Sequence, residues 1–561
     1  MTAPRLAADG YFYRGDTFLP LLGANYWPGS CGVDMWLTWP EAEIQADLDL
    51  MNRLGLNCIR FFVRWQDFEP EEGVYDDQKF DRLTQFLAWC DDRDILAQPS
   101  LFVGWMSGGE FWPAWRAGRN VFADPLMVER GAAFASRCAA AIAPFHHQLF
   151  GVDLGNELNC LNDSHAASPA KVEQWCATIS AAVRDAYPDA LIVSGCEHGQ
   201  VVGDSGWRFG QETGTDYYSM HAYPVPAWHP VSFDGLTDPL AQSLLPFYTQ
   251  CAKAFGPVLV QEFGTIVTGG ASQQDSYLRG MLPACWAAGG NGFLWWCLRD
   301  ITARVHPYVK NGFEGTLGLV DAAGNVKPGL EYFIEFGKSL TSPPPASAKP
   351  TVGLYWPKHY YLRDEPTNPG NDPRTTGARM VAANYLLREL GYNVAIIRGD
   401  LPLPASGVIV VASALLDIDE AAALAEWVTA GGKLVWHGPD PVNWGPDYQA
   451  LVGAVAVDYR APLSSTVTLR ADTYTFQSFA RGFKVQVEER GAAVLATDEH
   501  DVPMVLRHSL GSGCVVTAIP VVEDAFLAVS GRRGDREIWA SWYRSMLEIV
   551  TSKKGASQKG A

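Results

Sequence analysis

Residues 149–159 read LFGVDLGNELN, an apolar run that ends abruptly in an amide and a carboxyl. Seven further apolar runs occur before residue 297, separated by amphipathic stretches such as EAEIQADLDLMNRLG (41–55). The eight predicted strands are FLPLLGA (18–24), CIRFFV (58–63), ILAQPSLF (95–102), LFGVDLG (149–155), ALIVSG (190–195), YYSMH (217–221), PVLVQ (257–261) and GFLWW (292–296). Their continuous apolar character is typical of strands that are covered on both faces. An open doubly wound sheet has the same rhythm, but eight strand–helix units favour an α/β fold of the (β/α)₈ TIM barrel type over residues 1–340.

Residues beyond the predicted barrel divide into a linker, two smaller parts and a tail. The stretch TSPPPASAKP (341–350) is rich in Pro and Ser and predicts the linker. Alternating strand and helix patterns over 351–460, beginning with TVGLYW and GARMVAANYLLRELGY, predict a flavodoxin-like α/β domain. Short strands and turns over 461–550 predict a small β-rich module with a terminal helix. The polar tail 551–561 is predicted to be disordered.

Composition excludes several classes of partner. The 561-residue chain carries a formal net charge of −19, which repels phosphate backbones and anionic lipid, so we expect no nucleic-acid or membrane partner. No apolar run reaches the roughly 18 residues of a membrane span, and the N-terminal residues show no signal-peptide pattern. The eleven cysteines are scattered without metal-finger spacing, which predicts free thiols, no metal, no cofactor and a cytoplasmic location.

Two carboxyl groups follow predicted strands at the same end of the barrel. Asn156 and Glu157 end the fourth strand, and Glu262 ends the seventh in PVLVQEFGT. Active sites of such barrels lie at the C-terminal ends of the strands, so the two carboxyls are predicted to face each other. A separation of about 5–5.5 Å would suit double displacement, in which one carboxylate attacks and the other donates and then accepts a proton. A solvated glutamate at a helix start is the alternative interpretation of Glu157 alone.

Polar and aromatic residues on other strands complete the predicted site. Two residues are candidates for the donor or cation that keeps Glu262 ionised: Arg60 on the second strand, and Tyr223 after the sixth, with His221 beside it. The alternatives are an ion pair in the barrel core for Arg60 and a structural aromatic for Tyr223. The eighth strand ends in Trp295 and Trp296, one of which should point to the mouth because side chains alternate along a strand; we favour Trp295 as the floor under the bound sugar.

Long aromatic loops above the mouth are predicted to close one end of a cleft, which favours removal of terminal sugars. Loop packing without a role in binding is the alternative. The residues concerned are Trp105, Trp112 and Trp115 after the third strand, Trp228 and His229 after the sixth, and Trp207, Glu110 and Glu197 at the rim.

The segments GVDLGNELN, YYSMHAYP, VLVQEFGT, GFLWWCLRD and NCIRFF together resemble clan A glycoside hydrolases, particularly family 5, over about residues 18–335. The resemblance implies that Glu157 is the acid/base and Glu262 the nucleophile, with Asn156 contacting the sugar 2-hydroxyl. Arg60, His221 and Tyr223 would then be the supporting residues. Many family members carry a histidine after the third strand, whereas this chain reads QPSLFVGWMSGG there, so the sugar pocket is expected to differ.

The second domain resembles the glutamine-amidotransferase-like domain that follows the barrel in some β-galactosidases, where it supports trimerisation. Its turn reads LVWHGPDP (434–441) and lacks the cysteine that an active amidotransferase needs. The resemblance therefore implies assembly rather than catalysis, and we expect a homo-oligomer, either a dimer or a trimer.

The predicted function is that of a retaining β-glycosidase acting on an oligosaccharide or other β-glycoside. The family resemblance and the aromatic loops favour an exo-acting β-mannosidase, followed by a β-galactosidase or β-glucosidase. An endo-β-mannanase or cellulase would use the same carboxyls in an open cleft. A non-catalytic carbohydrate-binding protein would not need a facing carboxylate pair, and a metal-dependent hydrolase would need the histidines that GANYWPG (23–29) lacks.

Overall fold

A computed structural model describes residues 2–266, 270–345, 351–362, 373–413, 415–439, 444–460, 464–476, 482–487 and 491–552. The chain forms two compact units. Unit 1 comprises residues 1–225 and 235–345, and unit 2 comprises 226–234 and 346–561. The boundary at 345 falls within the predicted linker, of which residues 346–350 lie outside the described part of the chain. Most of the predicted tail, from residue 553 on, lies outside it as well.

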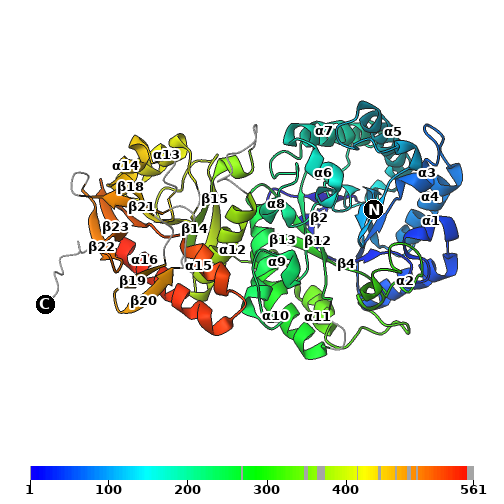
Figure 1. Ribbon diagram of the computed structural model, residues 1–561. Coiled ribbons are helices and arrows are strands. Elements are labelled where there is room, and N and C mark those ends of the chain that lie inside the picture. The colour runs from blue at the N-terminus through cyan, green and yellow to red at the C-terminus, as the bar shows by residue number, and fades with distance from the viewer. Residues whose placement is uncertain are drawn as a thin grey trace. The chain divides into compact units, whose positions relative to one another are not determined.

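Unit 1 contains the predicted barrel, with eight parallel strands arranged in chain order (Figure 1). The strands are β4 (Leu21–Tyr26), β5 (Cys58–Phe62), β6 (Leu96–Phe102), β9 (Val152–Gly155), β10 (Ile192–Val193), β11 (Tyr218–Ala222), β12 (Val258–Phe263) and β13 (Gly290–Trp295). The last strand, β13, pairs with the first, β4. Backbone hydrogen bonds from Asp216 to Ile192 (2.8 Å) and from His198 to His221 (3.1 Å) cross the remaining seam between β10 and β11.

Helices surround these strands, and their starting points follow from the local sequence. The helices are α2 (Glu41–Leu54), α4 (Asp77–Asp91), α5 (Pro125–Ile142), α7 (Pro169–Ala186), α9 (Pro239–Lys253), α10 (Ala271–Ala287) and α11 (Glu331–Ser339). Asp124, Ser168 and Asp238 each precede a proline and accept a backbone N–H of the first turn. An oxygen-bearing cap followed by proline is the combination that starts a helix most readily.

The N-terminal end of the barrel is closed by apolar packing. Strands β1 (Pro4–Leu6), β2 (Phe12–Arg14) and β3 (Thr17–Phe18) form a small antiparallel sheet. Phe12 from this sheet joins a fully buried cluster with Phe150, Tyr217 and Leu259, and its ring meets those of Phe150 and Tyr217 edge-on. Because this end is a packed core, only the opposite end can admit a substrate.

Unit 2 is built on a seven-stranded sheet whose order is β15, β14, β16, β17, β24, β23, β22. Strands β14 (Thr351–Trp356), β15 (Asn393–Arg398), β16 (Val408–Val411), β17 (Lys433–His437) and β24 (Gly513–Ala518) are parallel, whereas β23 (Pro503–Leu510) and β22 (Ala493–Thr497) are antiparallel. Helices α12 (Pro373–Glu389), α13 (Ile418–Thr429), α14 (Pro446–Val452) and α16 (Glu537–Thr551) pack against its strands, and α15 (Val522–Val529) packs against α12. The flavodoxin-like part and the predicted β-rich module thus share one sheet, so residue 460 does not separate two cores.

Two antiparallel strand pairs complete unit 2. Strand β18 (Val455–Arg460) pairs with β21 (Gly482–Gln486), and β19 (Ser465–Leu469) pairs with β20 (Asp472–Phe476). The loop 226–234, which follows β11 in the chain, groups with unit 2, and Ser232 N–H donates to Ser530 Oγ at 3.0 Å.

The states of the cysteines and the character of the helices can be compared with the predictions made from composition. All eleven thiols are free, and all except Cys160 are buried. Among the described residues, no helix combines the length and the apolar character needed to cross a bilayer.

Candidate active site

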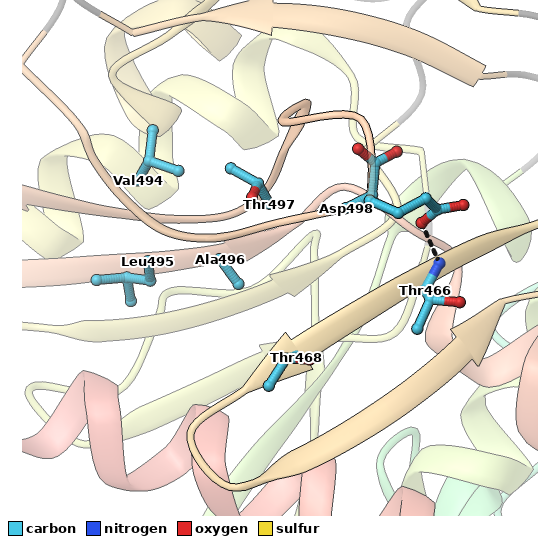
Figure 2. Close-up of a pocket in the computed structure, with 8 residues that line it drawn as sticks. Thr466, Thr468, Val494, Leu495, Ala496, Thr497 and Asp498 are labelled. Atoms are coloured by element: carbon cyan, nitrogen blue, oxygen red, sulfur yellow. Dashed lines mark hydrogen bonds between the residues drawn. The ribbon is translucent and has the colours of Figure 1, made fainter. Parts of the chain in front are cut away.

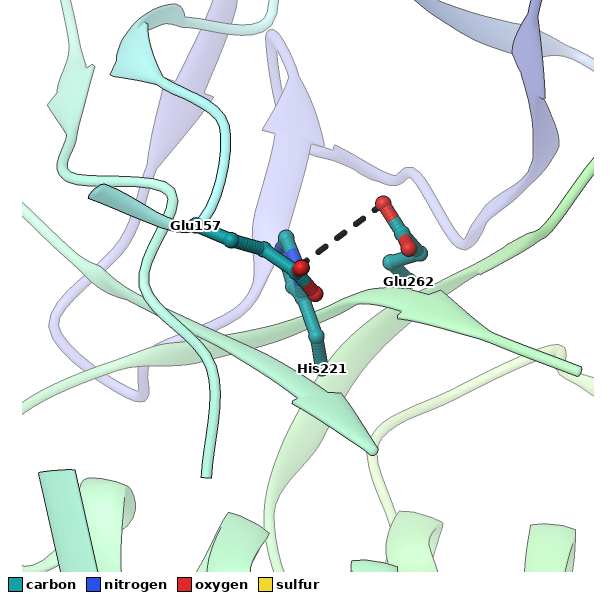
Figure 3. Close-up of side chains that lie close together, drawn as sticks. All are labelled: Glu157, His221 and Glu262. Carbon is teal, nitrogen blue, oxygen red and sulfur yellow. Dashed lines mark hydrogen bonds and ion pairs between the residues drawn. The ribbon is translucent and has the colours of Figure 1, made fainter. Parts of the chain in front are cut away.

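The two predicted carboxyls lie together at the open end of the barrel. Glu157 follows β9, and Glu262 is the penultimate residue of β12, where it pairs with His221 of the neighbouring β11. One ligand atom from each of Glu157, His221 and Glu262 lies within 4.8 Å of the other two, and Figure 3 shows the three side chains converging. Such a short separation suits a carboxylate pair in which one group attacks the substrate directly, without a water held between the two groups.

A sharp turn of the backbone directs Glu157 into the site. Its φ is +48°, a left-handed conformation that costs a residue with a side chain about 1 kcal/mol or more. The Glu157 N–H donates to Gly195 O at 2.8 Å, and the Asn156 N–H donates to Phe102 O at 2.9 Å. Gly195 must be a glycine, because a Cβ there would lie 1.7 Å from Gly155 O. The adjoining strands therefore hold the turn in place.

Arg60 connects the polar groups below the carboxyls. Its guanidinium is fully buried and bonds to Asp153 (2.7 Å), Asn25 (3.0 Å), Glu262 (3.1 Å) and Asn156 (2.9 Å). A planar fork with five donors suits such a divergent set of acceptors, which a lysine could not satisfy. Asn156 in turn donates its amide to the backbone oxygen of Trp105 at 2.6 Å.

Glu262 has more hydrogen-bond donors than Glu157. The Tyr223 hydroxyl donates to Glu262 Oε1 at 2.7 Å, and Arg60 donates to Oε2 at 3.1 Å. His221 Nδ1 lies 3.1 Å from Glu157 Oε1 and 3.7 Å from Glu262 Oε2. The structure thus brings Arg60, His221 and Tyr223 to the carboxyl pair.

The electrostatic environment distributes one proton over the two carboxyls. Burial raises the pKa of Glu157 to about 7, and the negative charge of Glu197 acts in the same direction. Burial also raises the pKa of Glu262 to about 7, while its neighbours His221 and Arg60 oppose that rise. Because adjacent buried carboxylates do not both ionise readily, the pair keeps one proton near neutral pH. Arg60 and Tyr223 donate to Glu262, and these hydrogen bonds favour the ionised form of that carboxyl.

The carboxyl–imidazole group resembles a cation site only superficially. Its three members are of the types that ligate metals, but Glu262 already bonds to a guanidinium and a phenol. The positive charge of Arg60 already balances the charge of Glu262. The arrangement is suited to a charged nucleophile beside a proton donor.

The preference for Trp295 as the floor of the site requires correction. Trp295 packs against Phe263 and against Phe333 of helix α11, and its indole N–H donates to Leu317 O at 2.9 Å. The following residue, Trp296, instead contacts the ring of Phe62, which lies 4.7 Å from the Arg60 guanidinium. Strand alternation therefore turns Trp296 toward the mouth and Trp295 toward the helices.

The other predicted tryptophans lie at different depths. Trp105 is half-buried on β7 (Gly104–Met106), with its backbone oxygen beside Asn156. Trp112 follows the hairpin partner β8 (Gly109–Phe111) and packs against Trp65. Trp207 is fully buried against Phe122 and Trp175 and donates to Ser164 at 2.9 Å, so the prediction that it lines the rim is wrong.

Two buried acids near the site had little or no weight in the sequence analysis. Glu314 accepts the Trp296 indole N–H at 3.1 Å and thereby orients that ring, and burial raises the pKa of Glu314. Glu197 accepts from Asn159 (2.6 Å) and Gly199 N–H (2.8 Å). Although burial opposes it, the adjacent His198 charge lowers the pKa of Glu197 to about 2. Nothing in the local sequence distinguishes Glu314 from a loop glutamate.

Unit 2 contains a pocket of about 540 Å³ between strands β19 and β22, and its lining differs from that of the barrel site (Figure 2). Its two acidic residues accept backbone N–H groups, Asp498 within a local turn and Glu499 from the facing strand β19. Glu499 accepts the Thr466 N–H at 2.7 Å, and Asp498 accepts the His500 and Val502 N–H groups. Threonine and small aliphatic side chains form the rest of its wall. These described residues do not form a facing acid pair like the one in the barrel.

Comparisons with known proteins agree with the barrel site. The sequence profile described as cellulase (glycosyl hydrolase family 5) matches residues 23–300. An exo-beta-1,4-mannosidase from Opitutaceae bacterium strain TAV5 is similar along the whole chain: it is 49% identical, the match covers 97% of this chain and 99% of that one, and the TM-score is 0.92.

More distant proteins share the fold alone. A GH5_18 enzyme from Streptomyces cattleya is 20% identical, covers 74% of this chain and 98% of its own, and superposes with a TM-score of 0.61. A beta-galactosidase from a Rahnella species is 14% identical, with 98% of this chain and 90% of that chain covered and a TM-score of 0.70. A curated beta-galactosidase from Xanthomonas manihotis matches at 25% identity over 139 residues, and the aligned stretch spans only 23% of either protein.

Proposed function

Given that the chain belongs to glycosyl hydrolase family 5 and is a retaining glycoside hydrolase, we propose that it is an exo-acting β-mannosidase that releases terminal mannose from β-1,4-linked chains. The observation that carries this substrate is the 49% identity to an exo-beta-1,4-mannosidase over 97% of the chain. The hairpin β7–β8 beside Asn156 adds support, since a wall at the barrel mouth favours action at a chain end.

We assign the two chemical roles from the hydrogen bonds. Glu262, ionised under the Tyr223 and Arg60 donors, attacks the anomeric carbon as the C–O bond to the leaving group breaks. Glu157, which holds the proton of the pair, gives that proton to the departing oxygen. Glu157 then takes a proton from water, whose oxygen displaces Glu262 from the anomeric carbon, so mannose leaves with its configuration retained.

Supporting roles follow from position. Asn156, held by Arg60 and by Trp105 O, is proposed to contact the sugar 2-hydroxyl, and Trp296 to form the apolar floor. Trp105 and Trp112 are proposed to line the wall. A cytoplasmic location remains a proposal, supported by the absence of a disulfide among the eleven cysteines, all of which lie in the described residues. The homo-oligomer and the amidotransferase-like ancestry of unit 2 remain proposals too.

The test compares aryl β-glycosides of mannose, glucose and galactose, followed by β-1,4-mannooligosaccharides with analysis of the released products. We expect hydrolysis of the mannoside and stepwise release of mannose. Preferred hydrolysis of another sugar would refute the substrate, and early appearance of mid-length products would refute the exo mode. A 2-fluoro mannoside should label Glu262 in the wild-type enzyme, and a label on another carboxylate would overturn the nucleophile.

A further inference from the structure

A row of hydrogen-bonded side chains runs from the closed end of the barrel to the carboxyl pair. Its members, Tyr217, Gln98, Gln261 and His221, are each 0% exposed. Gln98 Nε2 lies 2.6 Å from the Tyr217 hydroxyl, and Gln261 Nε2 lies 2.8 Å from Gln98 Oε1. His221 Nε2 lies 2.9 Å from Gln261 Oε1. The row crosses the barrel interior and ends 3.1 Å from Glu157.

The far end of the row sets the direction of every bond in it. The Tyr217 hydroxyl donates its hydrogen to Phe150 O at 3.4 Å. Its oxygen can therefore only accept a hydrogen bond from Gln98. Gln98 therefore turns its NH₂ group toward Tyr217 and its oxygen toward Gln261. Gln261 must donate its own NH₂ group to the Gln98 oxygen, and the Gln261 oxygen then faces His221. An amide oxygen only accepts, so His221 Nε2 must carry hydrogen.

This direction decides what His221 presents to the catalytic acid. A neutral imidazole with hydrogen on Nε2 has a lone pair on Nδ1. The Nδ1 atom lies 3.1 Å from Glu157 Oε1 and 3.7 Å from Glu262 Oε2. A carboxylate oxygen and an imine nitrogen repel each other at 3.1 Å unless a proton lies between them.

We propose that Gln98 and Gln261 are positioning residues that hold His221 as its Nε2–H tautomer, so that Nδ1 accepts the acidic proton of Glu157 in the resting enzyme. The inference rests on the proposed acid/base role of Glu157. Glu157 O–H exchanges Nδ1 for the glycosidic oxygen when substrate binds, and the proton leaves with the aglycone. The proton that Glu157 later takes from water returns it to the same bond with Nδ1.

The charges around His221 agree with a neutral ring. The groups that face it are Glu157 and Glu262 at the mouth, and Arg60 and Asp153 deeper in the barrel. Burial lowers the pKa of His221, with the Arg60 charge acting in the same direction, while Glu262 and Asp153 oppose the shift. In the hydrogen bond between His221 and Glu157, the imidazole is therefore the acceptor and the Glu157 carboxyl is the donor.

The test uses three single variants of the full-length enzyme. Gln98→Leu removes an amide that contacts neither carboxyl and frees Gln261 to rotate. Gln261→Glu keeps an acceptor on Nε2 but adds a charge that favours the imidazolium. Gln148→Leu is the matched control, because Gln148 is another fully buried amide but contacts Arg14 and Asp91 instead. Nitrogen NMR of histidine-labelled protein reports the tautomer, with the His221 signals identified by their loss in His221→Asn.

Kinetics supply the second readout, as pH profiles of kcat/KM for an unactivated disaccharide and for an activated aryl glycoside. Loss of an oriented acid should slow the disaccharide by about tenfold or more while the aryl glycoside changes far less. For Gln261→Glu the basic limb should move to lower pH, because an imidazolium at Nδ1 favours ionised Glu157. Gln148→Leu should match the wild type in both readouts.

We expect wild-type His221 to be neutral with hydrogen on Nε2 and Gln98→Leu to show a mixture of tautomers. Hydrogen on Nδ1, or an imidazolium, in the wild type at neutral pH would overturn the proposal. So would a Gln98→Leu enzyme with unchanged tautomer and pH profile. If Gln98→Leu fails to fold, the wild-type spectrum and Gln261→Glu decide the matter. The tautomer needs no substrate, so an enzyme that ignores mannosides but shows the expected spectra would refute only the proposed substrate.

Discussion

Replacing Tyr223 by Phe isolates one bond to the proposed nucleophile. The hydroxyl donates to Glu262 Oε1 at 2.7 Å, and Arg60 binds the other oxygen at 3.1 Å. The substitution removes a single buried donor and keeps the ring, so the shape of the site should persist. Glu262 then faces its substrate with one oxygen unsatisfied.

The magnitude follows from the type of bond. A hydrogen bond to a charged group contributes about 1.5–3 kcal/mol, and about 1.4 kcal/mol corresponds to a factor of ten. Losing the donor makes Glu262 harder to ionise, so part of the shared proton moves from Glu157 to Glu262. We therefore expect kcat/KM to fall by roughly 10- to 100-fold. Because the Tyr223 bond lowers the pKa of Glu262, its removal should move the acidic limb of the pH profile to higher pH.

The assay is the pH dependence of kcat/KM for an activated aryl mannoside, which needs little help from the acid and so reports on the nucleophile. Tyr26→Phe is the matched control, since Tyr26 is a buried phenol that donates to Asp47 at 3.1 Å, away from the carboxyl pair. It should lose some stability and keep its pH profile. A Tyr223→Phe enzyme with wild-type kcat/KM and an unmoved acidic limb would refute the reasoning.

Four further outcomes are expected. Glu157→Ala should slow a natural disaccharide about 100-fold more than an activated aryl mannoside, and azide should restore activity with a β-configured azide product; equal losses without rescue would contradict the acid role. Arg60→Leu leaves Asp153 buried without its partner and should cost about 3–5 kcal/mol in urea unfolding, so an unchanged midpoint would count against the network. Although burial opposes it, His437 at 2.7 Å holds the pKa of Glu523 below its ordinary value. The ionised Glu523 therefore stabilises the folded state above the ordinary pKa of about 4.3, and this stabilisation is lost as the pH falls below that value. Glu523→Gln should flatten the acid side of a plot of unfolding free energy against pH. Light scattering on the full chain at micromolar concentration should show a dimer or trimer, and a monodisperse monomer would remove the proposed assembly role of unit 2.

The barrel and its carboxyl pair could be predicted from sequence because their signals are local. Each predicted strand is a largely apolar run, and all eight are present in the structure. Glu157 and Glu262 each end such a run, and the rule that parallel strands of a barrel share one open end brings their side chains together. The positions of Arg60, His221 and Tyr223 beside the carboxyls follow from the same rule.

Other features depended on tertiary packing that strand periodicity does not contain. Alternation requires that Trp295 and Trp296 point to opposite sides, but only the contacts with Phe333 and Phe62 show which side each one takes. The sequence around Trp207 does not separate a rim position from a core position. In the structure its indole N–H donates to Ser164, which is distant in sequence, and the side chain is buried. In unit 2, strands separated by more than 70 residues, β17 and β24, pair within one sheet, which no local pattern indicates.

The electrostatics of the site were likewise decided by distant neighbours. Gln98 and Gln261 interrupt apolar strands, and a buried amide in such a run signals an unsatisfied hydrogen-bonding requirement, but the sequence does not say what satisfies it. Tyr217, Gln98 and Gln261 lie on three different parts of the chain and meet only in the closed barrel. The sequence alone therefore determined that Glu157 and Glu262 lie at the same end of the barrel, because strand direction is a local property. The fold decided the pKa values of both carboxyls, because a pKa depends on burial and on charges brought close from elsewhere in the chain.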